Sequence, residues 1–111
     1  MTEKIAGEVM VYEPIAILDI GEGSMRMEAS FALQNDSLHE FRLVLPPRSV
    51  IVKGRVDRCQ IGELRNGTLV YCCNVEFVDP APHVASTIRE FVALHHAPAS
   101  RVIDGEIADP I

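Results

Sequence analysis

The sequence contains no tryptophan, and only 5% of its 111 residues are aromatic. Positive charge is also scarce, because ten Lys and Arg face sixteen Asp and Glu and leave a net charge of −6. A protein that follows a nucleic-acid backbone needs a basic surface, and one that holds single strands needs aromatic rings on which bases stack. The composition therefore predicts no nucleic-acid partner.

Cysteine is sparse as well, and its spacing suits neither disulfides nor zinc. Cys72 and Cys73 are adjacent, so they point to opposite faces of any strand, and Cys59 leaves the count odd. No two cysteines or histidines have the CxxC or HxxxH spacing of a structural zinc site. We expect three reduced thiols, no bound metal and a reducing compartment, the cytoplasm.

Long apolar runs are missing too, as are the motifs of common enzymes. No stretch approaches the roughly 18 apolar residues of a membrane span, and Met1–Lys4 lacks the start of a secretory signal. There is no G-x-S-x-G elbow and no phosphate-binding G-x-x-x-x-G-K-[ST] loop. We therefore expect a cytoplasmic protein that is not an enzyme and does not insert into a membrane.

The first three-quarters of the chain alternate apolar and polar residues, which is typical of half-buried strands. Met25, Met27, Ala29 and Phe31 are the clearest example. Two predicted strands flank Pro14, which makes them either separate strands or one bent strand. These two strands are residues 8–12 and 15–20. Besides them and the strand at 25–31, strands are predicted at residues 41–45, 49–60 and 68–78.

The last two of these strands are separated by Asn66-Gly67. Both residue types readily take the positive φ that a tight primed turn requires. We therefore expect residues 49–60 and 68–78 to form a hairpin.

The period then changes from that of a strand to that of a helix. Val84, Ile88, Phe91 and Val92 fall on one stripe of an amphipathic helix, which we place at residues 81–95 and expect to pack against the strands.

Residues 97–111 contain two prolines and an excess of acids but no period. They are predicted to form a flexible acidic tail or to dock as a short extra segment, which leaves residues 1–96 as the domain. Six antiparallel strands followed by one C-terminal helix indicate a mainly β protein, a small closed or nearly closed barrel. An open sheet with the helix on one face is the alternative.

The segment from Leu18 to Ala29 contains a strand end, a turn with two glycines and the start of another strand. Taken alone, it is an ordinary β-turn in which Asp19 bonds a nearby backbone N–H and Gly21 and Gly23 take positive φ.

The order of four segments along the chain resembles the PilZ domain family. They are D-I-G-E-G-S-M-R-M from Asp19, then F-R-L-V-L at 41–45, V-K-G-R-V at 52–56 and V-E-F-V at 75–78, before the predicted helix. That family is a six-stranded β-barrel with a C-terminal helix, and most of its members are bacterial receptors for cyclic di-GMP. The resemblance covers about residues 8–95 and implies the same fold here.

The resemblance also locates a degenerate ligand site. In the family, cyclic di-GMP is held by an N-terminal R-x-x-x-R and by a [DN]-x-S-x-x-G turn. Here Asp19 keeps the acid position, Gly21 replaces the serine and Ser24 replaces the glycine, with Gly23 and Arg26 beside them. The arginine motif is absent, because residues 1–18 contain no arginine. Losing two guanidiniums should weaken binding about a hundred- to ten-thousand-fold.

The resemblance therefore implies a bacterial signalling or adaptor module that acts through a protein partner, in motility or surface polysaccharide control, without a cofactor. The alternative is a receptor that binds cyclic di-GMP through a rearranged site built from Asp19, Ser24 and Arg26. Arg55 and Arg58 are the other arginines expected near that site.

Overall fold

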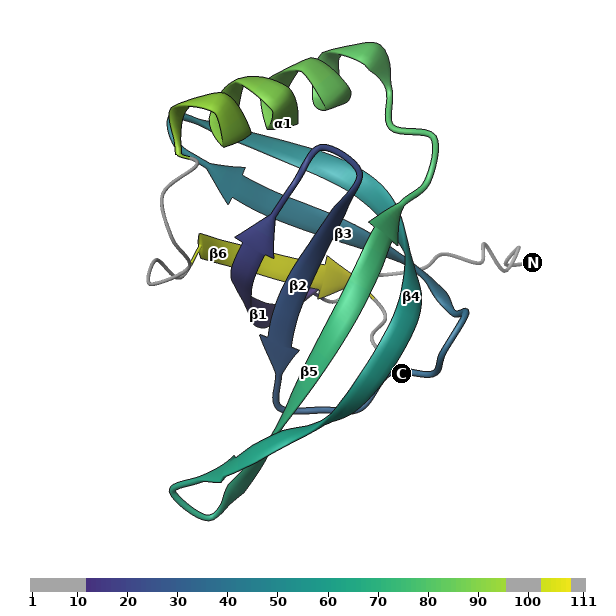
Figure 1. The fold of residues 1–111 in the computed structure, drawn as a ribbon, viewed down its shortest axis with the longest axis vertical. Helices are drawn as coiled ribbons and strands as arrows, with labels where there is room; N and C mark the ends of the chain where they lie inside the picture. The colour runs from purple at the N-terminus through teal and green to yellow at the C-terminus, as the bar shows by residue number, and fades with distance from the viewer. Residues whose placement is uncertain (1–11, 96–102, 109–111) are drawn as a thin grey trace, which may run out of the picture.

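The structure is a computed structural model that describes residues 12–95 and 103–108 (Figure 1). Six antiparallel strands close into a barrel in the order β1-β2-β5-β4-β3-β6, with one helix. The predicted fold class is confirmed, and the alternative of an open sheet is wrong. The elements are β1 (Tyr12–Ile20), β2 (Ser24–Ala29), β3 (Leu38–Leu45), β4 (Arg48–Arg65), β5 (Thr68–Phe77), α1 (Pro82–Leu94) and β6 (Ile103–Ala108).

The barrel interior is filled by the apolar half of the alternating pattern. Met25 and Met27 of β2 are buried, and so are Phe41 and Leu43 of β3. Because successive side chains of a strand point to opposite faces, Arg26 lies outside the barrel between the two methionines.

β1 is one strand that runs through Pro14. This residue lies opposite Glu106 of β6, so the proline is accommodated in regular pairing with the last strand. Of the two alternatives for the strands that flank Pro14, one continuous strand is confirmed from Tyr12 onward. Residues 8–11 of the predicted strand lie outside the described residues.

The sixth strand comes from the predicted tail. For residues 103–108 the alternative of a short docked segment is confirmed, and the flexible tail outside a domain that ends at residue 96 is wrong. These residues form β6, which pairs with both β1 and β3 and thereby closes the barrel. Ile107 is fully buried, and a Cβ on Gly105 would lie 2.7 Å from Cδ1 of Ile17. The remaining tail residues lie outside the described part of the chain.

The helix α1 lies across one end of the barrel (Figure 1). Val84, Ile88 and Phe91 are buried, and Val92 packs against the core, which confirms the predicted stripe. The helix begins at Pro82, and its end is marked by His95, whose N–H donates to the Phe91 carbonyl at 2.9 Å. Within residues 12–95 and 103–108, no helix has the length and apolar character needed to cross a membrane.

At the opposite end, the hairpin of β4 and β5 extends beyond the other strands (Figure 1). Its turn has positive φ at Asn66 (50°) and Gly67 (78°), as the primed turn requires, which confirms the predicted hairpin. β4 continues to Arg65, five residues past its predicted end. We call residues 61–70 the arm.

Candidate functional site

The turn that the resemblance singles out joins β1 to β2 near α1. The Gly21 N–H donates to the Ser24 carbonyl at 2.8 Å, and the Phe77 N–H donates to the Gly23 carbonyl at 2.9 Å. Glu22 also meets Nε of Arg89 on α1 at 2.9 Å. The turn is therefore bonded to itself, to the end of β5 and to the helix.

Asp19 and Arg26 face each other across the two strands. The two residues are opposite each other in the pairing of β1 with β2, and the Arg26 guanidinium lies 2.7 Å from the Asp19 carboxylate. Both side chains are about half exposed, at 53% for Asp19 and 46% for Arg26. An ion pair this exposed contributes about 0–1 kcal/mol, so the carboxylate is held weakly. Among the described residues, the partner found for the Asp19 carboxylate is the Arg26 guanidinium and not the backbone N–H that was predicted.

The two glycines of the turn do not require their missing side chains. Neither Gly21 nor Gly23 has the positive φ predicted for them. A Cβ on Gly21 would come no closer than 3.8 Å to the Ser24 carbonyl oxygen, and one on Gly23 would meet nothing within 4 Å. The turn therefore has room for the serine hydroxyl that the family places at position 21.

Two adjoining hollows lie beside the turn on the outer face of β2, β5 and β4. They share Arg26 and Asn74, which are register partners, and Asn74 is in turn opposite Arg58 on β4. The larger, of about 430 Å³, is lined by Ser24, Met25, Arg26, Asp57, Asn74, Val75 and Glu76. The smaller, of about 270 Å³, is lined by Arg26, Arg58, Gln60, Cys72 and Asn74.

Charge in these hollows is largely matched. Arg26 meets Asp19, and Arg55 meets Glu76 at 3.2 Å. Arg58 makes no ion pair with any residue that the structure describes. Of the three arginines expected near the site, this leaves one whose charge is not offset by a contacting acid.

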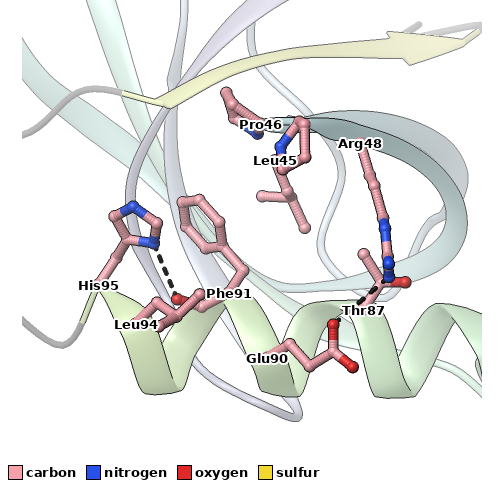
Figure 2. Close-up of a pocket in the computed structure, with 9 residues that line it drawn as sticks. Leu45, Pro46, Arg48, Thr87, Glu90, Phe91, Leu94 and His95 are labelled. Carbon is pink, nitrogen blue, oxygen red and sulfur yellow. Dashed lines mark hydrogen bonds and ion pairs between the residues drawn. The ribbon is translucent and has the colours of Figure 1, made fainter.

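A separate groove of about 110 Å³ lies between the C-terminal half of α1 and the turn from β3 to β4 (Figure 2). Leu45 and Phe91 contribute apolar surface, and the His95 ring stacks on Phe91 at 4.2 Å between centroids. Arg48 and Glu90 form an ion pair at 3.4 Å across the groove. The groove is therefore lined by apolar side chains and crossed by one ion pair.

Cys59, Cys72 and Cys73 are free cysteines in this structure. Cys59 and Cys73 are register partners, and burial, with the neighbouring Cys59 thiol, raises the pKa of the Cys73 thiol. Cys73 is therefore held as a neutral thiol inside the barrel. Among the described residues, no three His, Cys, Asp or Glu side chains are grouped so that they could hold a metal ion.

Sequence reasoning located the turn but missed Asn74. Nothing in the sequence around Asn74 marks it, because its place between Arg26 and Arg58 depends on the pairing of β5 with both β2 and β4. A correct strand register would have been the signal that reveals it.

Comparison with known proteins adds no family to these observations. No family model, no curated protein and no solved structure matches the chain. The resemblance to the PilZ family therefore rests on the turn at Asp19 and the segments that follow it, and it stays a prediction.

Proposed function

We propose that this protein is a PilZ-like bacterial signalling or adaptor module whose cyclic di-GMP site is degenerate. It acts in the cytoplasm through contacts with other proteins, without catalysing a reaction. Motility and control of surface polysaccharides are the processes that the resemblance favours.

The observation that carries this proposal is the pairing of Asp19 with Arg26 at 2.7 Å. Asp19 is the one residue that keeps its family identity in the turn, and its carboxylate already has a cationic partner. Gly21 offers no hydroxyl, and the Ser24 carbonyl accepts the Gly21 N–H. A ligand at the turn would have to exchange Arg26 for itself at Asp19, and it would find no side-chain hydroxyl at position 21 in return.

Local charge points the same way. Cyclic di-GMP carries two phosphates, which bind best to guanidiniums that are not already neutralised. Arg26 and Arg55 each contact an acid, and Asp57 and Glu76 line the larger hollow. Binding a dianion in the larger hollow would require breaking these ion pairs or placing the ligand beside Asp57 and Glu76.

Protein contacts are favoured by the surfaces that the barrel leaves open. Leu94 is 78% exposed and lines the groove beside α1, where Phe91 contributes apolar surface. An exposed apolar side chain beside a groove is a common feature of surfaces that bind proteins.

Calorimetric titration with cyclic di-GMP tests the proposal. We expect a dissociation constant weaker than about 100 μM at physiological salt, because the two arginines are missing. Gly21→Ser with Ser24→Gly should leave binding weak, since the change restores only uncharged groups. Adding Glu3→Arg and Gly7→Arg, four residues apart, should strengthen binding at least about a hundredfold. Tight binding by the unmodified protein would contradict the proposal.

A second candidate function is a receptor that binds cyclic di-GMP through a rearranged site. The row of Arg26, Asn74 and Arg58 beside the turn favours it, since two guanidiniums flank an amide there. This function predicts a low-micromolar dissociation constant that is lost in Arg58→Ala. Arg48→Ala is the matched control, because Arg48 lies beside α1 and lines neither hollow.

A further inference from the structure

The arm is a two-stranded ribbon whose backbone does not pair with the other strands of the barrel that the structure describes. β3 pairs with β4 only at residues 48–55, and β2 pairs with β5 only at residues 71–76. Among the described residues, 61–65 and 68–70 therefore have backbone partners only in each other. An isolated hairpin is marginally stable in water, so this ribbon would gain from further strands.

The arm also exposes three large apolar side chains. Ile61, Leu64 and Leu69 are 60%, 67% and 42% exposed, and Leu64 lies opposite Leu69. Elsewhere the barrel is closed. The outer edge of β4 in the arm has no strand partner among residues 12–95 and 103–108, so another strand can join it.

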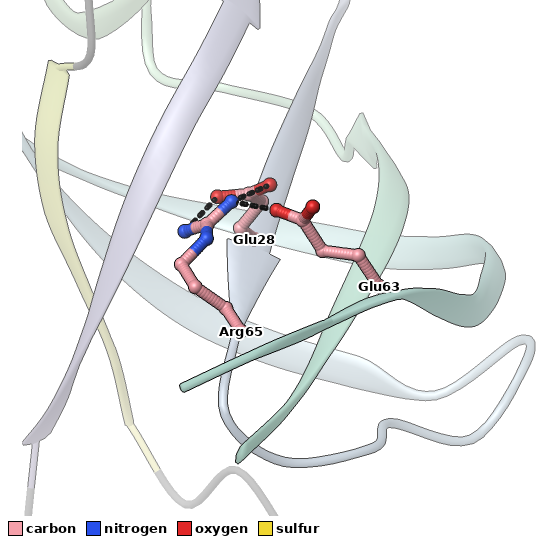
Figure 3. A network of polar contacts seen from close by, with 3 residues as sticks. All are labelled: Glu28, Glu63 and Arg65. Atoms are coloured by element: carbon pink, nitrogen blue, oxygen red, sulfur yellow. Dashed lines mark hydrogen bonds and ion pairs between the residues drawn. The ribbon is translucent and has the colours of Figure 1, made fainter. Parts of the chain in front are cut away.

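The charged residues on this edge determine which strands can pair with it. Glu63 and Arg65 flank Leu64, and they share one face of the strand because they are two residues apart. Within one copy, Arg65 forms ion pairs with Glu63 and, at 3.4 Å, with Glu28 of β2 (Figure 3). An antiparallel strand that places an arginine opposite Glu63 and a glutamate opposite Arg65 would complement both charges.

The arm itself is such a strand. When two copies are related by a two-fold axis at Leu64, Leu64 lies opposite Leu64, and Glu63 of each copy lies opposite Arg65 of the other. Moving the axis to Glu63 or to Arg65 would instead place like charges opposite each other, which is unfavourable. The pattern Glu63-Leu64-Arg65 is thus complementary to itself in one register, as an isologous contact requires.

The backbone is oriented for the same register. In a two-residue hairpin the residues next to the turn, here Arg65 and Thr68, face each other as a hydrogen-bonding pair. Because this orientation alternates along a strand, the N–H and C=O of Leu64 point outward, toward the position of an added strand.

We propose that the arm is a homodimerisation surface, in which β4 edges of two copies pair antiparallel about Leu64 and form a four-stranded ribbon. The register irregularity between Ile61 and Glu63 confines the regular edge to residues 63–65. The contact is therefore smaller than a standard interface of about 1,200–2,000 Å², and we expect a dissociation constant between about 10 μM and 1 mM.

Sedimentation equilibrium of the full chain, up to about 1 mM, tests this contact. The wild type should form dimers. Leu64→Lys should weaken dimerisation at least about tenfold, because two ammonium groups would meet at the axis. Ile51→Lys is the matched control, since Ile51 is also an exposed apolar residue of β4 (51%) but lies outside the arm, and it should leave the dimer unchanged.

A charge reversal provides a second test that does not remove apolar surface. Glu63→Arg and Arg65→Glu should each weaken the dimer about tenfold, and the double variant should restore it because the two charges are exchanged. A chain that stays monomeric at about 1 mM overturns the proposal, as does a dimer that is indifferent to Leu64→Lys and both charge reversals. Neither outcome bears on cyclic di-GMP binding, which involves another part of the barrel.

Discussion

At the scale of single residues, space inside the barrel decides which small residues are required. Gly54 of β4 faces the interior, where a Cβ would lie 2.4 Å from Cγ1 of Val75 and 2.8 Å from Cε2 of Phe41. Gly23, by contrast, would meet nothing within 4 Å. One glycine is needed for packing and the other is not, although the sequence alone does not distinguish them.

Gly54→Ala should therefore lower the free energy of unfolding by about 1–3 kcal/mol, because the added methyl overpacks a filled interior. Gly23→Ala is the control and should change stability by less than about 0.5 kcal/mol. Urea denaturation followed by circular dichroism measures both values. Equal losses in the two variants would contradict the assigned packing.

At the scale of elements, α1 is attached to the barrel by its apolar stripe and far less by its charges. Phe91 is 8% exposed and packs within the core. Arg89 is 63% exposed, and its ion pair with Glu22 is open to solvent. Burying the Phe91 ring stabilises the fold because it removes apolar surface from water. The exposed ion pair contributes little to stability, because both charged groups stay hydrated whether or not they are paired.

Phe91→Ala should accordingly reduce the free energy of unfolding by about 3–5 kcal/mol. Arg89→Ala on the same helix should cost less than about 1 kcal/mol. Thermal or chemical unfolding of the two variants provides the comparison, and small effects at both positions would refute the buried face of α1.

At the scale of the whole molecule, the barrel depends on β6. This strand covers the edges of both β1 and β3, and Arg42 of β3 forms an ion pair with Glu106 on it. Tyr12 of β1 reaches Glu40 of β3 at 2.8 Å, and the Arg42 guanidinium lies 5.3 Å from the centre of the Tyr12 ring. Side chains of β1, β3 and β6 are therefore in contact where β6 closes the barrel.

Deleting residues 103–111 should abolish cooperative unfolding, because it uncovers two strand edges and removes the buried Ile107. Deleting only residues 109–111, which follow β6, should leave the unfolding transition in place. Circular dichroism melts of the two shortened chains test this, and a sharp transition in the longer deletion would show that β6 is dispensable.

Much of this architecture was predictable from local patterns. Alternation identified β2 and β3, Asn66-Gly67 identified the hairpin, and the helical stripe identified α1. β6 was missed because its six residues carry little apolar signal of their own, and their burial is supplied by β1 and β3. For the candidate site, the turn at Asp19 was predictable, but its pairing with Arg26 and the position of Asn74 depend on strand register.

The closing position of β6 also has a kinetic consequence. Tyr12 pairs with Ala108, so the contact that completes the barrel joins residues from nearly opposite ends of the described chain. Pairing between residues so distant in sequence requires closing a large loop, which slows folding. During synthesis, β1 and β3 emerge early and wait with unpaired edges until β6 is made. Until β6 is made, the nascent chain can therefore associate with other chains through these two edges.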